Sequence, residues 1–178
     1  MLEIELKVRV DALEPVRERL QQFNAESFGR VHEHDIYYNA PHRNFATTDE
    51  ALRVRYADGK AVVTYKGAKI KNLGLKAREE LNTAVESGEV FNEILARLGF
   101  MRTAEVNKWR EHYRYGNASI ALDEVEHLGT FVEIEVIADT ETQAAAERID
   151  TIKKELGIKG RIITPKDYVL ESLKEEKF

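Results

Sequence analysis

The amino-acid sequence predicts an α+β fold in which eight antiparallel strands form a closed β-barrel and helices pack outside it. Apolar and polar residues alternate in eight segments, which is the period-two pattern of strands that bury one face. Four other segments carry the spacing of amphipathic helices and can cover the apolar side of the sheet. Eight strands are about the number that closes a small barrel, and the polar faces of these strands are mostly charged.

Length and composition indicate one folded domain over residues 1–178, because 43% of the residues are apolar and 33% are charged. The net charge of -5 argues against non-specific binding to nucleic acid. The absence of cysteine excludes disulfides, thiolate metal ligands and cysteine nucleophiles. No apolar run approaches the roughly 18 residues of a membrane helix, and the charged N-terminus lacks a signal sequence. We therefore expect a cytoplasmic protein with no nucleic-acid or membrane partner.

The eight expected strands occupy residues 2–10, 30–38, 51–57, 60–66, 75–83, 104–115, 118–125 and 131–138. Asp58-Gly59 is a strong two-residue turn signal between the third and fourth of these strands. This turn would place Arg53 opposite Thr64 and Arg55 opposite Val62.

A second turn signal, Gly116-Asn117, joins the strands 104–115 and 118–125. It would place Arg110 opposite Asp123, with Lys108 on the same face. Trp109 alternates with these two basic residues, so we expect it to face outward into the helix layer.

Four helices are expected, beginning after Asp11, Ser87, Thr140 and Thr164. The first would bury Leu13, Val16, Leu20 and Phe23, and the second would bury Val90, Ile94, Leu95 and Leu98 before a stop at Gly99. The third would bury Ile149, Ile152 and Leu156 before Gly157.

Charged residues recur at alternate positions along the expected strands. The basic ones are Lys7, Arg53, Arg55, Lys66, Arg78, Lys108 and Arg110, and the acidic ones are Glu3, Glu5, Glu80, Asp123, Glu133 and Glu135. A solvated sheet face is the simple alternative. Such a face usually includes Ser, Thr and Gln, however, whereas these positions are almost all charged. In a barrel covered by helices they would converge inside, where charges are costly unless they are paired or bind a ligand.

The chemistry of this charged set indicates a ligand. Clustered carboxylates without cysteine suit Mg²⁺ or Mn²⁺, and clustered Arg and Lys suit phosphate oxygens. The two together predict a metal-bound polyphosphate.

These residues resemble the CYTH domains, also called triphosphate tunnel metalloenzymes. Glu3-Ile4-Glu5-Leu6-Lys7 matches the ExExK signature that opens this family. The other matching segments are Asp35-Ile36-Tyr37-Tyr38, LRVR at 52–55, TYKG at 64–67, Arg78 with Glu80, Lys108 with Arg110, Asp123, Leu128-Gly129 and FVEIE at 131–135. The chain most resembles the short CyaB-type proteins called class IV adenylyl cyclases.

The resemblance implies a closed tunnel that holds a triphosphate and one or two divalent ions. The implied metal ligands are Glu3, Glu5, Asp123, Glu133 and Glu135, with pairing to Arg110 as the alternative role of Asp123. The implied triphosphate-binding residues are Lys7, Arg53, Arg55, Lys66, Arg78, Lys108 and Arg110, with Glu80 in support. Glu3, Glu5 and Lys7 would be catalytic through metal and phosphate positioning.

The family motifs leave the reaction open, because members cyclise ATP, hydrolyse inorganic triphosphate or hydrolyse thiamine triphosphate. Conversion of ATP to cyclic AMP and pyrophosphate is the preferred prediction, and a triphosphatase is the alternative. A non-catalytic polyphosphate-binding module is a third hypothesis, although a plain anion binder gains nothing from the carboxylates. A homodimer is possible, since short members are often dimers.

The sequence leaves the roles of two further features open. Residues 67–76 form either a lid over the tunnel mouth or a solvated loop. His32 and His34 have a spacing that could ligate zinc, but no third ligand is evident, because Asp35 lies on the other face of the strand.

Overall fold

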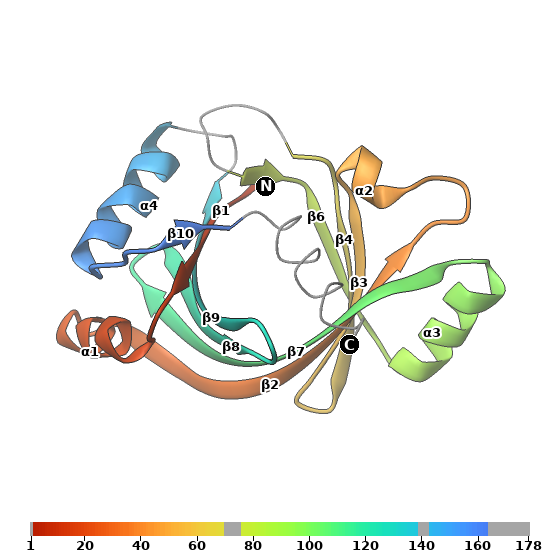
Figure 1. Cartoon of the computed structure of the whole chain (residues 1–178), viewed down its shortest axis with the longest axis horizontal. Coiled ribbons are helices and arrows are strands. Elements are labelled where there is room, and N and C mark those ends of the chain that lie inside the picture. The colour runs from red at the N-terminus through yellow and green to blue at the C-terminus, as the bar shows by residue number, and fades with distance from the viewer. Residues whose placement is uncertain (1, 70–75, 139–142, 164–178) are drawn as a thin grey trace.

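The computed structural model describes residues 2–69, 76–138 and 143–163, which form a strongly curved sheet with helices on its outer side (Figure 1). The strands are β1 (Leu2–Val10), β2 (Glu26–Asn39), β3 (Ala51–Ala57), β4 (Lys60–Lys66), β5 (Lys76–Arg78), β6 (Glu80–Val85), β7 (Met101–Tyr115), β8 (Ala118–Val125), β9 (Gly129–Ala138) and β10 (Arg161–Ile162). The helices are α1 (Glu14–Gln22), α2 (Phe45–Thr48), α3 (Gly88–Arg97) and α4 (Gln143–Glu155). None of the helices in these ranges is long and apolar enough to cross a membrane.

The predicted closed eight-stranded barrel is wrong, because hydrogen bonds do not close the sheet. The antiparallel strands follow the order β10-β1-β9-β8-β7-β2-β3-β4-β6, and β5 lies off this path and pairs with β1. The physical reason is a break in the expected strand 75–83 at Glu79. Arg78 on one side of the break pairs with Glu3 of β1, and Glu80 on the other side pairs with Lys66 of β4. The carbonyl of Glu79 accepts a hydrogen bond from the Gly67 amide (2.9 Å).

Both predicted hairpin registers are confirmed. Arg53 pairs with Thr64, and Arg55 with Val62, across a turn in which Asp58 and Gly59 have φ of 49° and 70°. Two successive positive φ angles are the requirement of a type I′ turn, which Asp-Gly meets with little strain.

The second hairpin pairs Arg110 with Asp123, as the Gly116-Asn117 turn predicts. Trp109 faces outward as expected, but it is 46% exposed rather than buried under a helix. Its ring contacts His32 edge-on, with the two ring centroids 5.1 Å apart.

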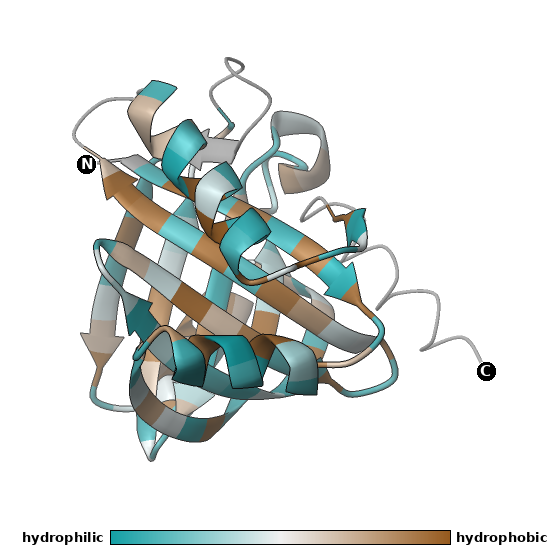
Figure 2. Cartoon of the chain, turned by 90° about the vertical axis from the view of Figure 1, so that its left-hand side faces the viewer, coloured by the Kyte–Doolittle hydropathy of each residue, from teal (hydrophilic) through white to brown (hydrophobic). Residues whose placement is uncertain are grey.

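The main hydrophobic core lies between the outer face of the sheet and helices α1 and α4. Alternate strand residues such as Ile4, Ile120 and Ile134 contact buried helix residues such as Leu20 and Ile149. Figure 2 shows this alternation as brown and teal bands along the strands. Because the apolar side chains face the helices, the charged side chains at the intervening positions face the concave side of the sheet.

Helix α1 begins differently from the prediction. Its N-cap is Leu13, which makes no side-chain capping bond, so the predicted cap at Asp11 is wrong. Pro15 in the first turn favours a helix start there, since its missing N–H would have no partner in any case. The predicted start at Thr140 and the helix expected after Thr164 lie outside the described residues.

Helix α3 begins at the predicted cap but turns a different face to the sheet. The Ser87 hydroxyl accepts a hydrogen bond from the Val90 amide (3.2 Å), as predicted. Of the expected apolar stripe only Leu95 is buried, whereas Val90, Ile94 and Leu98 are 48–63% exposed.

Close contact with Tyr56 explains this orientation of α3. A Cβ atom added at Gly88 would lie 2.5 Å from the Tyr56 ring, so only glycine allows this approach. The Asn92 amide donates a hydrogen bond to the Tyr56 hydroxyl (2.7 Å). The face with Gly88, Asn92 and Leu95 therefore packs on the sheet.

Candidate functional site

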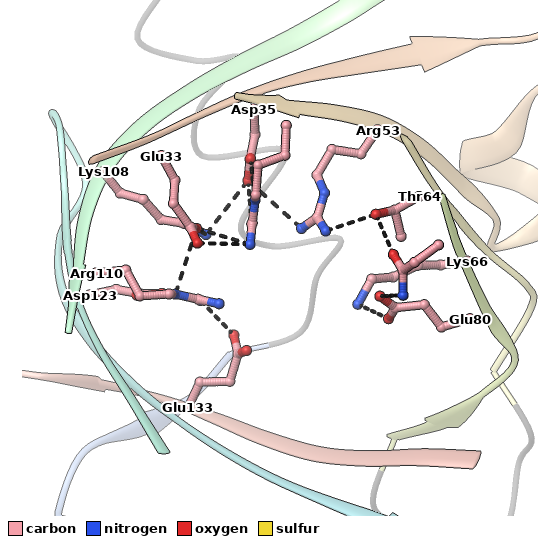
Figure 3. A network of polar contacts seen from close by, with 12 residues as sticks. Glu33, Asp35, Arg53, Thr64, Lys66, Glu80, Lys108, Arg110, Asp123 and Glu133 are labelled. Atoms are coloured by element: carbon pink, nitrogen blue, oxygen red, sulfur yellow. Dashed lines mark hydrogen bonds and ion pairs between the residues drawn. The ribbon is translucent and has the colours of Figure 1, made fainter. Parts of the chain in front are cut away.

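Charged side chains predicted from the strand pattern converge on the concave face of the sheet, and Figure 3 shows Arg53, Lys66, Glu80, Lys108, Arg110, Asp123 and Glu133 among them. None of the thirteen is classed as exposed, and Lys7, Arg78, Lys108 and Arg110 are at most 8% exposed. A solvated sheet face would leave such residues in water, so that alternative is excluded. The side chains form two groups, one rich in ion pairs and one rich in carboxylates.

The ion-paired group contains two acidic residues that the sequence analysis did not include in the site. Asp35 accepts two hydrogen bonds from Arg55, at 2.6 Å from Nε to Oδ1 and 2.7 Å from Nη2 to Oδ2. Glu33 Oε2 lies 3.0 Å from Arg55 Nη1 and 3.2 Å from Lys108 Nζ. Both carboxylates are buried, with 3% of Glu33 and none of Asp35 exposed.

The surrounding cations keep both carboxylates ionised. Burial alone would raise the pKa of Asp35, but Lys108, Arg53 and Arg55 hold it below its usual range. Burial likewise opposes ionisation of Glu33, whose pKa is lowered by a hydrogen bond from His112 and by nearby cations. The signal that could have found these residues is their place two apart on β2, where Glu33 is the cross-strand partner of Lys108.

Asp123 and Glu133 also lie in this ion-paired group. Asp123 accepts two hydrogen bonds from Arg110, each 2.6 Å long. Glu133 accepts one from Lys7 at 2.8 Å. Burial opposes the charge of each acid, but Arg110 keeps the pKa of both below the usual range. Of the two roles expected for Asp123, the contact present is the one with Arg110.

The carboxylate-rich group lies where β1, β6 and β9 meet. It comprises Glu3, Glu5, Glu80 and Glu135, and Lys66 Nζ lies 2.6 Å from Glu80 Oε2 and 3.5 Å from Glu3 Oε2. Burial and a hydrogen bond with Glu80 raise the pKa of Glu3 to about 9. Although burial opposes it, the same hydrogen bond and Lys66 lower the pKa of Glu80 to about 2. Glu3 and Glu80 therefore share a proton near neutral pH.

Glu135 is the next carboxylate in this group, and burial and the negative charge of Glu133 raise its pKa as well. It pairs with Glu5 across β1 and β9. This part of the site therefore holds more negative charge than its basic neighbours neutralise. Hard oxygen donors under such repulsion suit a divalent cation, although no three Asp, Glu or His side chains of the described residues converge as a formed metal centre.

Two guanidinium groups in the site retain unused donors. Arg53 Nε and Arg78 Nε are buried and have no hydrogen-bond acceptor among the described residues. Buried N–H groups without acceptors are rare in folded proteins, because each has lost its hydration without replacement. These two are available to an anionic ligand on the concave face.

The remaining candidates from the sequence lie elsewhere. His34 is on the convex face, where its ring stacks on Tyr56 with centroids 5.8 Å apart. The first residues of the 67–76 loop are tethered, since Lys69 Nζ lies 3.1 Å from Asp49 Oδ1. Residues 70–75 are outside the described part of the chain.

Comparison with known proteins identifies the family. The model of the CYTH domain matches residues 1–165. This chain belongs to the CYTH domain family. A protein of Methanocaldococcus jannaschii named as a candidate adenylate cyclase is 37% identical over 171 residues, which cover 95% of this chain and 97% of that protein.

Solved structures of other proteins have a similar fold. A protein of Pyrococcus horikoshii OT3 aligns with a TM-score of 0.84 at 34% identity, over 98% of this chain and 99% of that chain. A protein of Hippeastrum named as a candidate adenylyl cyclase, with a dominant triphosphatase activity, aligns with a TM-score of 0.67 at 17% identity, over 99% of this chain and 96% of that chain. At that identity the second likeness shows the fold alone.

Proposed function

We propose that this CYTH protein is a divalent-metal-dependent enzyme that binds a triphosphate on its concave face and converts ATP to cyclic AMP and pyrophosphate. One observation carries the proposal. Arg53 Nε and Arg78 Nε, which are buried and have no acceptor within the described part of the chain, lie on the same concave face as the clustered carboxylates of Glu3, Glu80 and Glu135. The guanidinium N–H groups can donate hydrogen bonds to an anion, and the clustered carboxylates can bind a cation. A metal-bound triphosphate supplies both.

The charge balance of the site supports metal dependence. With Glu33 and Asp35 included, the seven basic side chains of the predicted set face eight acidic ones. Because Glu3 and Glu80 share a proton, these side chains are close to neutral overall, and a triphosphate alone would bring an excess of negative charge into the site. Divalent ions would offset that charge and neutralise phosphate oxygens.

The residues divide between two roles in this proposal. Glu3, Glu5 and Glu135 would hold Mg²⁺ or Mn²⁺, because these carboxylates gather where β1 pairs with β9 and repel one another. Asp123 and Glu133 are already paired with Arg110 and Lys7, so they would instead orient phosphate-binding groups. The metal would supply positive charge beside the reacting phosphorus.

The basic side chains supply the rest of the catalysis. Phosphoryl transfer requires in-line positioning and charge neutralisation more than covalent help from the protein. Arg53, Arg55, Lys66, Arg78, Lys108 and Arg110, with Lys7, would bind the phosphate oxygens. In the cyclase reaction the ribose 3′-oxygen bonds to the α-phosphorus, the bond from that phosphorus to the bridging oxygen breaks, and pyrophosphate leaves. The proton of the 3′-hydroxyl passes to a water molecule of the solvent.

A triphosphatase is the second candidate, since the same groups would position the triphosphate for attack by water. The charged face would hold the triphosphate equally well for attack by either nucleophile. The cyclase and the triphosphatase would use the same charged face, so only the reaction products distinguish the two activities.

Phosphorus NMR of the reaction products tests the proposal. The protein is incubated with Mg²⁺ or Mn²⁺ and either ATP or tripolyphosphate. Cyclic AMP with pyrophosphate from ATP is the expected result. Orthophosphate released from either substrate would replace the cyclase assignment with the triphosphatase. Binding without turnover would identify a polyphosphate-binding module.

A further inference from the structure

A hollow of about 590 Å³ lies on the outer side of the sheet, between helix α3 and the strands β2, β3 and β7 (Figure 1). It faces away from the charged site. Ile36 of its lining follows Asp35 on β2, and Tyr56 follows Arg55 on β3, so the two sites lie on opposite faces of the same strands. The volume is within the range of small-molecule pockets in proteins. The proposed reaction uses no residue of this hollow.

Two buried side chains that line the hollow have a polar atom without a hydrogen-bond partner in the described part of the chain. Tyr38 is 3% exposed, and its hydroxyl is one of these atoms. Asn92 is 8% exposed. Its amide N–H donates to the Tyr56 hydroxyl (2.7 Å), but its Oδ1 accepts no hydrogen bond from the described residues. A buried polar atom without a partner costs stability, because it has lost its hydration without replacement. Both atoms therefore indicate a polar group of a ligand beside them.

The rim of the hollow carries a carboxylate that no basic side chain of the described residues neutralises. This carboxylate is Glu89, which accepts a hydrogen bond from the Ser87 hydroxyl (3.2 Å). The other charged residues of the rim are paired, Glu93 with Arg97 at 2.8 Å and Arg102 with Glu105 at 3.3 Å. The unmatched charge of the hollow is therefore negative, which favours a cationic ligand over an anionic one.

Aromatic rings form much of the lining. The His34 ring stacks on Tyr56 with centroids 5.8 Å apart, and Phe100 also lines the hollow. Aromatic rings attract organic cations through their negatively polarised faces, and they also bury apolar parts of a ligand. Rings beside an unmatched carboxylate thus suit a molecule that joins an apolar body to a positive charge.

We propose that this hollow is a second ligand site, which binds a small organic cation with an apolar or aromatic body. The apolar body packs on the rings of Tyr56 and Phe100. The cationic head lies near Glu89 and donates hydrogen bonds to Asn92 Oδ1 and to the Tyr38 oxygen. The site binds independently of a triphosphate, because it lies on the other face of the sheet.

Benzylamine is the probe for the test, because it joins a ring to one ammonium group. Benzyl alcohol is its uncharged counterpart. Each is titrated into the wild-type protein and followed through amide chemical shifts in two-dimensional NMR. We expect resonances of α3 and β2 to move, with benzylamine binding roughly fivefold more tightly than benzyl alcohol, the scale of one cation–π contact. Saturating tripolyphosphate should leave the affinity for benzylamine unchanged.

Three substitutions locate the binding site. Ala96→Trp fills the hollow and should abolish benzylamine binding. Glu89→Gln should weaken binding by roughly threefold, the scale of an exposed ion pair. Its matched control is Glu86→Gln, which changes an exposed carboxylate outside the lining. Tyr38→Phe removes the hydroxyl without a partner, so binding should weaken by roughly fivefold while the free energy of unfolding in urea does not fall.

Several results would overturn the second site. Wild-type benzylamine binding in Ala96→Trp would place the probe elsewhere, and equal affinity for benzylamine and benzyl alcohol would remove the role of the charge. Competition by tripolyphosphate would place the amine among the carboxylates of the concave face. Wild-type binding with lowered stability in Tyr38→Phe would give that hydroxyl a structural role instead. Absence of shifts in α3 and β2 at millimolar benzylamine would contradict the proposal outright.

Discussion

Asp35 binds Arg55 through both of its carboxylate oxygens, at 2.6 and 2.7 Å, and neither oxygen is exposed to solvent. The same carboxylate lies 3.6 Å from Lys108 Nζ and 3.8 Å from Arg53 Nη1. One acidic side chain thus contacts three of the proposed phosphate-binding groups.

Replacement of this carboxylate should be strongly destabilising. Asp35→Asn keeps the shape of the side chain but leaves Arg55 and Lys108 without their main buried counter-charge. Loss of one partner of a buried ion pair costs about 3–5 kcal/mol, so the free energy of unfolding in urea should fall by that amount. Glu105→Gln, on an exposed carboxylate, is the control and should change stability by less than about 0.5 kcal/mol. Equal stability of the two variants would contradict this role of Asp35.

Lys108 should make tripolyphosphate binding sensitive to alkaline pH. Burial, together with the repulsion of Arg110, lowers the pKa of Lys108 from 10.5 to about 8. Above that pH the amine becomes neutral and attracts phosphate less, so affinity measured by calorimetry should fall from pH 7 to pH 9.5. Lys108→Arg stays charged throughout and should bind with a flatter pH profile. An identical decline in both proteins would show that another group titrates.

The lowered pKa of Lys108 also predicts how the free energy of unfolding changes with pH. Because the folded-state pKa of Lys108 is depressed, the unfolded chain binds this proton more tightly between about pH 8 and pH 10.5. The contribution of Lys108 to stability therefore rises as pH increases through that window, and the rise should be absent in Lys108→Arg.

Glu3→Gln should separate metal binding from folding. Glu3 shares a proton with Glu80, so a neutral amide at this position mimics the metal-free state and should leave the thermal midpoint without metal near the wild-type value. Millimolar Mg²⁺ should raise the midpoint of the wild type, because a cation that binds only the folded state stabilises it. The rise should be lost in Glu3→Gln and retained in Glu124→Gln, which changes an exposed residue of β8. A full Mg²⁺ effect in Glu3→Gln would remove Glu3 from the metal ligands.

Gly160→Ala should disturb the edge of the sheet. A Cβ atom at this position would lie 1.9 Å from the carbonyl oxygen of Arg9, so β10 would have to move away from β1. Gly59→Ala is the control, since φ is also positive there but nothing lies within 4 Å of the added atom. We expect Gly160→Ala to lose about 1–3 kcal/mol more unfolding free energy than Gly59→Ala. Equal losses would mean that backbone conformation alone matters at Gly160.

The strand pattern was sufficient to predict most of the site, because period two fixes which residues share a face of a sheet. It placed Arg110 opposite Asp123 and brought Lys66 to the same face as Arg53. Glu33 and Asp35 were missed because the alternation of β2 was interpreted from its histidines, which turned out to lie on the outer face.

Features that depend on tertiary contacts could not be predicted in this way. The exposed face of α3 follows from the close approach of Gly88 to Tyr56, which is distant in sequence. At the break, the Glu79 carbonyl accepts a hydrogen bond from the amide of Gly67, which lies on the other side of the 67–76 loop. Helix and strand periodicity contains no information about either contact.

The break at Glu79 also determines where the concave face can change its width. The ladder of β5 belongs to β1, and the ladder of β6 belongs to β4. A small rotation of the backbone at this one residue moves the two ladders apart without separating any strand pair. The seam between Arg78 and Glu80 is therefore the place where a change in curvature would leave the β1–β5 and β4–β6 ladders intact.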